Sequence, residues 1–180
     1  MKNQNTKKLA YAALFLALCL VLPMLTGQIP QIGSMLLPMH IPVLLCGLVC
    51  GWQYGAAVGF VAPLLRSVLF GMPPMYPVAI AMAFELLTYG LVIGLVYRRM
   101  AQKGAAGVYA ALLAAMVAGR LVWGVAEVVL LGLGGKAFTA QAFLAGALLN
   151  AVPGIIVQLV LIPAVMAALQ KAEAVKEYAE

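Results

Sequence analysis

Residues Leu36–Gly90 read LLPMHIPVLLCGLVCGWQYGAAVGFVAPLLRSVLFGMPPMYPVAIAMAFELLTYG. This stretch contains three apolar segments, which are separated only by short turns at Gly51–Gly55 and Gly71–Pro74. Apolar segments joined by connections this short pack as neighbouring antiparallel elements. Any charged side chain within them must then face protein or a cavity rather than lipid.

The composition indicates that most of the protein surface faces lipid. Of the 180 residues, 66% are hydrophobic and 9% are charged, whereas a soluble domain usually carries about 25% charged residues. The formal net charge of +6 arises from basic residues beside apolar segments, which favours membrane orientation over nucleic-acid binding. We expect one membrane domain over residues 1–180, because no linker or low-complexity run divides the chain.

The apolar segments predict an all-α bundle of six transmembrane helices. Their expected bounds are Leu9–Leu25, Met35–Cys50, Gly55–Phe70, Pro77–Tyr97, Ala105–Leu133 and Ala140–Leu169. The first segment lacks a small-x-small cleavage motif, so we expect a retained helix rather than a removed signal peptide. Pro153 and Pro163 are expected to kink the last helix.

The basic residues between and beyond these helices predict their orientation. Six spans place both termini on one side of the membrane. That side then holds eight basic residues, namely Lys2, Lys7, Lys8, Arg98, Arg99, Lys103, Lys171 and Lys176. Lys136 alone lies on the opposite side. By the positive-inside rule, both termini are cytoplasmic.

Several polar side chains fall inside the expected helices at related depths. They are His40, Arg66, Glu85, Arg120, Glu127 and Asn150. At a rise of 1.5 Å per residue, each lies within roughly 20 Å of the expected outer end of its helix. The cytoplasmic half has almost none, so the pattern predicts a polar pocket that opens outward in a small bundle.

The spacing within the fifth helix supports such a pocket. Arg120, Trp123 and Glu127 stand at i, i+3 and i+7 and therefore share one helical face. Arg120 and Glu127 are too far apart for an easy direct pair, which leaves both available to a ligand. Arg66 and Glu85 have an alternative, because neighbouring helices let them form a buried ion pair that serves packing. His40 also has an alternative role, which is to stabilise the start of its helix through its ring.

Several chemistries are excluded by what the sequence lacks. It contains no aspartate, no G-x-S-x-G, no H-E-x-x-H and no P-loop. Cys19, Cys46 and Cys50 lie in apolar runs and are expected to pack rather than to bind metal. A channel needs polar groups through its full depth, and here they are confined to the outer half. The two halves of the chain also show no matched broken helices, which are typical of inverted-repeat carriers. We expect no enzyme activity, no metal and no cofactor, but a membrane protein that captures a small solute from outside.

Several motifs resemble one known family. They are the Leu37–Val43 stretch, the Gly51-x-x-Tyr54-Gly55-Ala56 turn, Pro63-Leu64-Leu65, the Gly71–Pro74 turn and Phe84-Glu85-Leu86-x-x-Tyr89-Gly90. These motifs are similar to those of the substrate-binding S components of energy-coupling factor (ECF) vitamin transporters. The local similarity covers about residues 36–97, and the length, six spans and orientation extend it to the whole chain.

The resemblance implies partners, a location and a substrate class. It implies a prokaryotic plasma-membrane protein that docks on a transmembrane T protein, which couples it to two ATPase subunits. Docking in this family uses an A-x-x-x-A arrangement on the first helix, which Ala13 and Ala17 match, because small residues let helices approach closely in lipid. The implied substrate is a water-soluble vitamin. Pantothenate would use Arg120 or Arg66 for its carboxylate.

Other substrates and functions remain open at the level of sequence. A B6-type or pyrimidine vitamin would instead use Asn150 and Glu127 and stack on Trp123. Two further hypotheses are a stand-alone secondary carrier and a structural membrane protein whose buried charges serve only packing.

Overall fold

The computed structural model describes residues 2–26, 35–100, 104–135, 139–145 and 151–172. The α-helices are α1 (Lys2–Val21), α3 (His40–Cys50), α4 (Trp52–Phe70), α5 (Ile80–Met100), α6 (Ala105–Leu133), α7 (Ala140–Leu144) and α8 (Val152–Lys171). A 3-10 turn over Leu22–Thr26 extends α1, and an irregular turn over Met75–Ala79 leads into α5. The described residues contain no strand, which confirms the all-α prediction.

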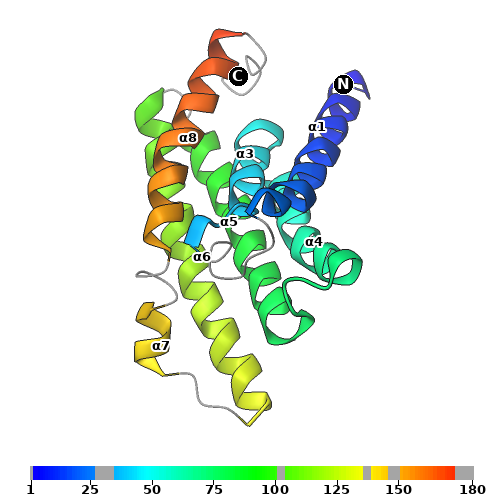
Figure 1. Ribbon diagram of the computed structural model, residues 1–180. Helices are drawn as coiled ribbons and strands as arrows, with labels where there is room; N and C mark the ends of the chain where they lie inside the picture. Colours follow the sequence, from blue (N-terminus) through cyan, green and yellow to red (C-terminus); the bar gives the residue numbers. More distant parts are fainter. Residues whose placement is uncertain (1, 27–34, 101–103, 136–138, 146–150, 173–180) are drawn as a thin grey trace.

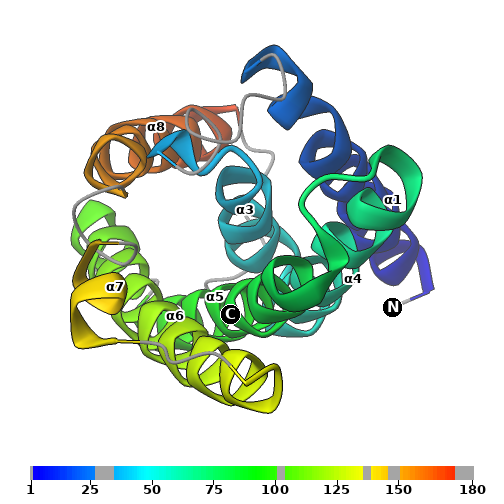
Figure 2. The ribbon, with the colours of Figure 1, turned by 60° about the horizontal axis from the view of Figure 1, so that its bottom comes forward.

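Five apolar helical segments are long enough to cross a membrane. They are Asn5–Leu25, Trp52–Phe70, Met75–Met100, Ala105–Leu133 and Val152–Lys171. The sixth principal helix, α3, has only 11 residues. It lies inside the bundle, where it contacts α1, α4, α5 and α8 (Figure 2). The start of α1 and the end of α8 lie at the same end of the bundle (Figure 1), as an even number of crossings requires. The chain is therefore a multi-pass membrane protein.

Glycine brings three consecutive helices into backbone contact. A Cβ atom built on Gly55 of α4 would lie 2.7 Å from the Cα atom of Gly47 in α3 and 2.8 Å from the carbonyl oxygen of Gly90 in α5. Gly51, which links α3 to α4, has a φ of 95° that favours glycine. The single-residue link and the close contacts explain why Leu36–Gly90 forms the centre of the fold.

Two of the expected helices have different bounds in the structure. Helix α3 starts at His40 rather than at Met35, because Leu37 has a φ of 50° and interrupts the helical backbone. Of the helix expected over Ala140–Leu169, the structure describes α7, which ends at Leu144, and α8, which begins at Val152, while residues 146–150 lie outside the described residues.

Proline accounts for the start of α8. Pro153 stands in the first turn of α8, where its missing N–H is not needed, so it begins a helix instead of kinking one. Pro163 does lie inside α8, as expected. The first helix is longer at its start than expected, because α1 begins at Lys2 rather than at Leu9.

Candidate substrate site

The interior of the bundle holds a group of three ionisable side chains from three helices. The Nη1 atom of Arg120 in α6 lies 3.0 Å from the Oε1 atom of Glu85 in α5. The Nε2 atom of His40, at the start of α3, lies 3.4 Å from the same oxygen. His40 and Glu85 are each only 1% exposed. Residues predicted separately as site candidates therefore meet at one carboxylate.

Tyr89 completes this group on the side of α5. Its ring meets the His40 ring edge to face, with 5.1 Å between ring centroids. Gly119 makes the approach possible, because a Cβ atom there would lie 2.7 Å from the Tyr89 ring. We name His40, Glu85, Tyr89 and Arg120 the central cluster.

An aromatic pair borders the central cluster. The Arg120 guanidinium lies 5.9 Å from the centroid of the Trp123 ring, a distance that allows a cation–π interaction. Trp123 in turn stacks on Phe143 of α7, with 6.1 Å between ring centroids and an interplanar angle of 27°. Phe143 also packs onto Gly124, where a Cβ atom would approach the ring to 2.4 Å. The contact holds α7 against α6 beside the charged residues.

Two of the three guanidinium nitrogens of Arg120 have no hydrogen-bond partner among the described residues. Its Nε and Nη2 atoms are buried, and no described residue accepts a hydrogen bond from either. The Nε–H and the nearer Nη2–H of an arginine point in the same direction and form a two-donor fork that fits the two oxygens of a carboxylate. Glu85 thus engages one edge of Arg120 and leaves the fork on the other edge open.

Arg66 is buried at a different contact. Its Nη1 atom donates to the backbone oxygen of Leu20 near the end of α1, and its guanidinium lies 5.2 Å from the centroid of the Phe70 ring. The alternative of an ion pair between Arg66 and Glu85 does not occur, because Arg120 and His40 are the partners of Glu85. Arg66 instead ties α4 to α1, where a carbonyl near a helix end accepts a positively charged donor.

The other sequence-predicted residues fall in different places. The His40 ring does not cap α3, since no side-chain hydrogen bond to the start of this helix occurs among the described residues. Glu127 is buried on α6, on the same helical face as Arg120 and Trp123. Asn150 lies outside the described residues.

Sequence reasoning missed Gln158 of α8. This side chain is 1% exposed, and its Nε2 atom has no hydrogen-bond partner within the part of the chain that the structure describes. The available signal was an amide inside an apolar segment. An uncharged side chain interrupts an apolar run less visibly than a charge does, so Gln158 was not predicted as a site residue.

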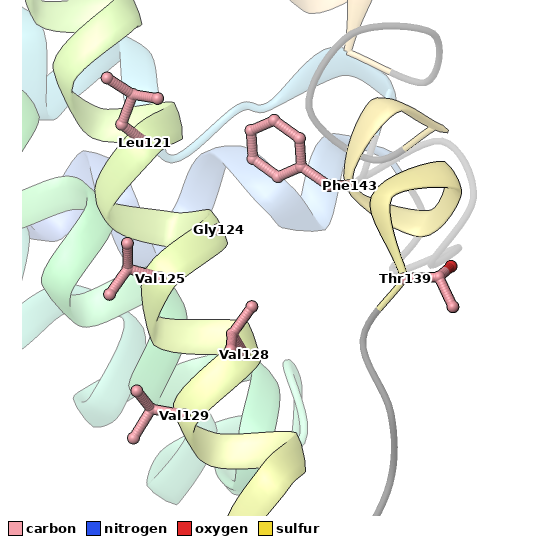
Figure 3. A pocket seen from close by; sticks show the side chains of 7 residues that line it. All are labelled: Leu121, Gly124, Val125, Val128, Val129, Thr139 and Phe143. Carbon is pink, nitrogen blue, oxygen red and sulfur yellow. The ribbon is translucent and has the colours of Figure 1, made fainter.

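A separate apolar pocket of about 370 Å³ lies between α6 and α7 (Figure 3). It is lined by Leu121, Gly124, Val125, Val128, Val129, Thr139 and Phe143. Leu121, Val125, Val128 and Val129 are exposed on the outer surface of the helix, which in a membrane protein faces lipid. None of the ionisable side chains of the central cluster lines this pocket, so it is distinct from the candidate site.

The helices and the buried charges define a small multi-pass membrane protein with a polar interior. A family model described as "ECF transporter, substrate-specific component" matches residues 7–166. The match covers most of the chain, and the protein belongs to this family. It is therefore a cell-membrane transport subunit, not an enzyme, that binds a small-molecule substrate and works with the T protein and ATPase module of an ECF transporter. No curated protein and no solved structure matches the chain.

Proposed function

We propose that the protein captures pantothenate for ECF-driven uptake and that Arg120 binds the substrate carboxylate. The observation that carries this proposal is the open, buried fork of Nε and Nη2 on Arg120. A buried donor without a partner is unfavourable, and a carboxylate satisfies both donors at once. Glu85 supports the arrangement because it holds the opposite edge of the same guanidinium at 3.0 Å.

The balance of donors and acceptors supports the same substrate class. Among the described residues, three buried donors lack a hydrogen-bond partner, namely Arg120 Nε, Arg120 Nη2 and Gln158 Nε2, whereas the buried acceptor Glu85 Oε1 lies 3.0 Å from Arg120 Nη1. A ligand that complements this set offers more acceptors than donors. Pantothenate does so, since it carries a carboxylate at one end and an amide with two hydroxyl groups at the other.

A flat ring vitamin of the B6 or pyrimidine type fits less well. It would gain most of its binding free energy by stacking on Trp123. That ring already stacks on Phe143 and lies beside the Arg120 guanidinium, so a second ring would have to displace Phe143. Pantothenate is flexible and needs no such displacement.

Binding of a vitamin panel to the purified protein, measured by titration calorimetry, tests the proposal, and Arg120 variants locate the carboxylate. Arg120→Lys keeps the charge but loses the fork, so it should weaken pantothenate binding about tenfold to a hundredfold. Arg120→Ala should weaken it more than about thirtyfold. It also leaves Glu85 without its arginine partner and should lower the melting temperature, so affinity is expressed per folded molecule.

Arg66→Lys is the matched control. It makes the same change at a buried arginine whose hydrogen bond goes to Leu20 of the protein itself. We expect it to leave pantothenate affinity unchanged, with any loss confined to stability. Unchanged affinity in both Arg120 variants would remove Arg120 from the site, and binding of a different vitamin in the panel would replace pantothenate.

A further inference from the structure

Helix α8, which carries Gln158, packs against α3 and against the chain that leads into it. Gly154, one turn before Gln158, packs on the chain ahead of α3, since a Cβ atom there would lie 2.6 Å from the backbone oxygen of Met35 and 2.9 Å from that of Leu36. Helices α3 and α8 run in the same direction (Figure 1). Gln158 follows Gly154 by one helical turn, and His40 follows Leu36 by four residues, so both lie just beyond this contact along the chain.

The buried face of α8 points Gln158 inward. Gly154, Gln158, Ile162 and Met166 are the buried residues of this helix and recur every four positions, so they form one stripe. Ile162 and Met166 continue the stripe into the hydrophobic core around α3. A leucine at position 158 would extend that core, whereas the amide is buried with its Nε2 donor unpartnered among the described residues. Packing alone does not account for it.

We propose that Gln158 is a specificity-determining residue that donates a hydrogen bond from Nε2 to a neutral oxygen of the substrate, opposite the carboxylate-binding fork of Arg120. This inference rests on the proposed function, which supplies the ligand. His40 contributes to the same side through Nδ1, which is buried without a hydrogen-bond partner among the described residues, while its Nε2 atom lies 3.4 Å from Glu85 Oε1. The substrate thus binds with its acid end at α6 and its amide or hydroxyl end between α3 and α8.

Gln158→Met tests the inference, since methionine has a similar shape and no donor. Affinity is measured by titration calorimetry for pantothenate and for pantothenol, in which a hydroxymethyl group replaces the carboxylate. We expect Gln158→Met to weaken binding of both ligands by the same factor, about fivefold to tenfold. Arg120→Lys should instead weaken pantothenate far more than pantothenol. The melting temperature of Gln158→Met without ligand should be unchanged or higher, because the variant buries no unpaired amide.

Gln170→Met is the control on the same helix. The Nε2 atom of Gln170 donates to the Tyr97 hydroxyl at 3.2 Å, so this amide has a protein partner and its loss should leave both affinities unchanged. Equal affinities for Gln158→Met and the unsubstituted protein, or a lower melting temperature with no change in affinity, would overturn the role of Gln158. Failure of the unsubstituted protein to bind pantothenate overturns the proposed substrate instead, and the two glutamine variants are then compared with the panel vitamin that does bind.

Discussion

The absence of a side chain at Gly90 allows the backbones of α4 and α5 to approach closely. A Cβ atom on Gly90 would lie 2.2 Å from both the carbonyl carbon and the oxygen of Gly55, and a helix backbone cannot yield as a flexible side chain does. Gly90→Ala should therefore force the helices apart and cost about 3 kcal/mol of folding free energy. Unfolding by denaturant in detergent micelles measures this loss.

Gly132 provides the matched control for that substitution. It also lies inside a long helix, α6, but a Cβ atom there meets nothing within 4 Å. Gly132→Ala should leave stability unchanged or raise it by about 0.5 kcal/mol, because alanine favours the helix. Equal losses in the two variants would mean that helix contact does not limit the choice of residue at position 90.

At the residue scale, the sequence located the charges but not all of their partners. His40, Glu85 and Arg120 were all predicted as site candidates, because charges in apolar helices must face inward. The sequence left open whether Glu85 pairs with Arg66, and the structure pairs it with Arg120 instead, since the choice of partner depends on how each helix is rotated about its axis. Spacing along one helix gives its inward face, but the relative rotation of two helices follows from packing.

At the scale of elements, α1 presents the small residues expected to dock on the T protein. Ala13 and Ala17 are both exposed on the surface of this helix, which leaves them available to a partner helix. Replacing both with leucine should abolish assembly with the T protein and substrate uptake, because large side chains hold helix backbones apart. Substrate binding by the isolated subunit should persist. Co-purification and uptake assays measure the first two properties, and calorimetry measures the third.

Helix α8 offers a control with the same residue type and spacing. Ala164 and Ala168 are also exposed and four residues apart. Their replacement with leucine should leave uptake intact. Loss of uptake in both double variants would indicate a general effect of surface bulk, and normal uptake in the α1 variant would remove α1 as the docking helix.

Element boundaries were predictable where hydrophobicity changes and unpredictable where only backbone geometry changes. The end of α4 at Phe70 and the bounds of α6 at Ala105 and Leu133 match the prediction. The start of α3 depends on the positive φ of Leu37. A positive φ at a leucine cannot be predicted from the residue type. The start of α8 at Val152 lies within apolar sequence, so the hydrophobic pattern did not mark it.

At the scale of the whole molecule, the membrane orientation remains a prediction from the distribution of basic residues. Cysteine labelling tests it after Cys19, Cys46 and Cys50, which are buried, have been replaced with alanine. A membrane-impermeant reagent added to intact cells should label Gly134→Cys, at the end of α6, but not Arg99→Cys, at the end of α5. Labelling at both sites, or only at Arg99→Cys, would contradict the predicted topology.

The fold class and the membrane location followed from composition alone. With 9% charged residues, the chain cannot cover a water-facing surface, and helices are the form in which separate apolar segments cross lipid. The arrangement of those helices was less accessible, because the central position of α3 depends on close glycine contacts with α4 and α5. The composition is compatible with close helix contacts but does not show where they occur.

The shortness of α3 bears on how the chain enters the membrane during synthesis. Eleven residues extend about 16 Å as a helix, roughly half of the 30 Å hydrocarbon core, so the translocon has too little apolar length in α3 to recognise it as a separate span. Only Gly51 lies between α3 and α4, so the two helices enter lipid as one hairpin. Glu85 follows only with α5, so water or lipid headgroups must solvate the His40 ring until α5 packs against this hairpin.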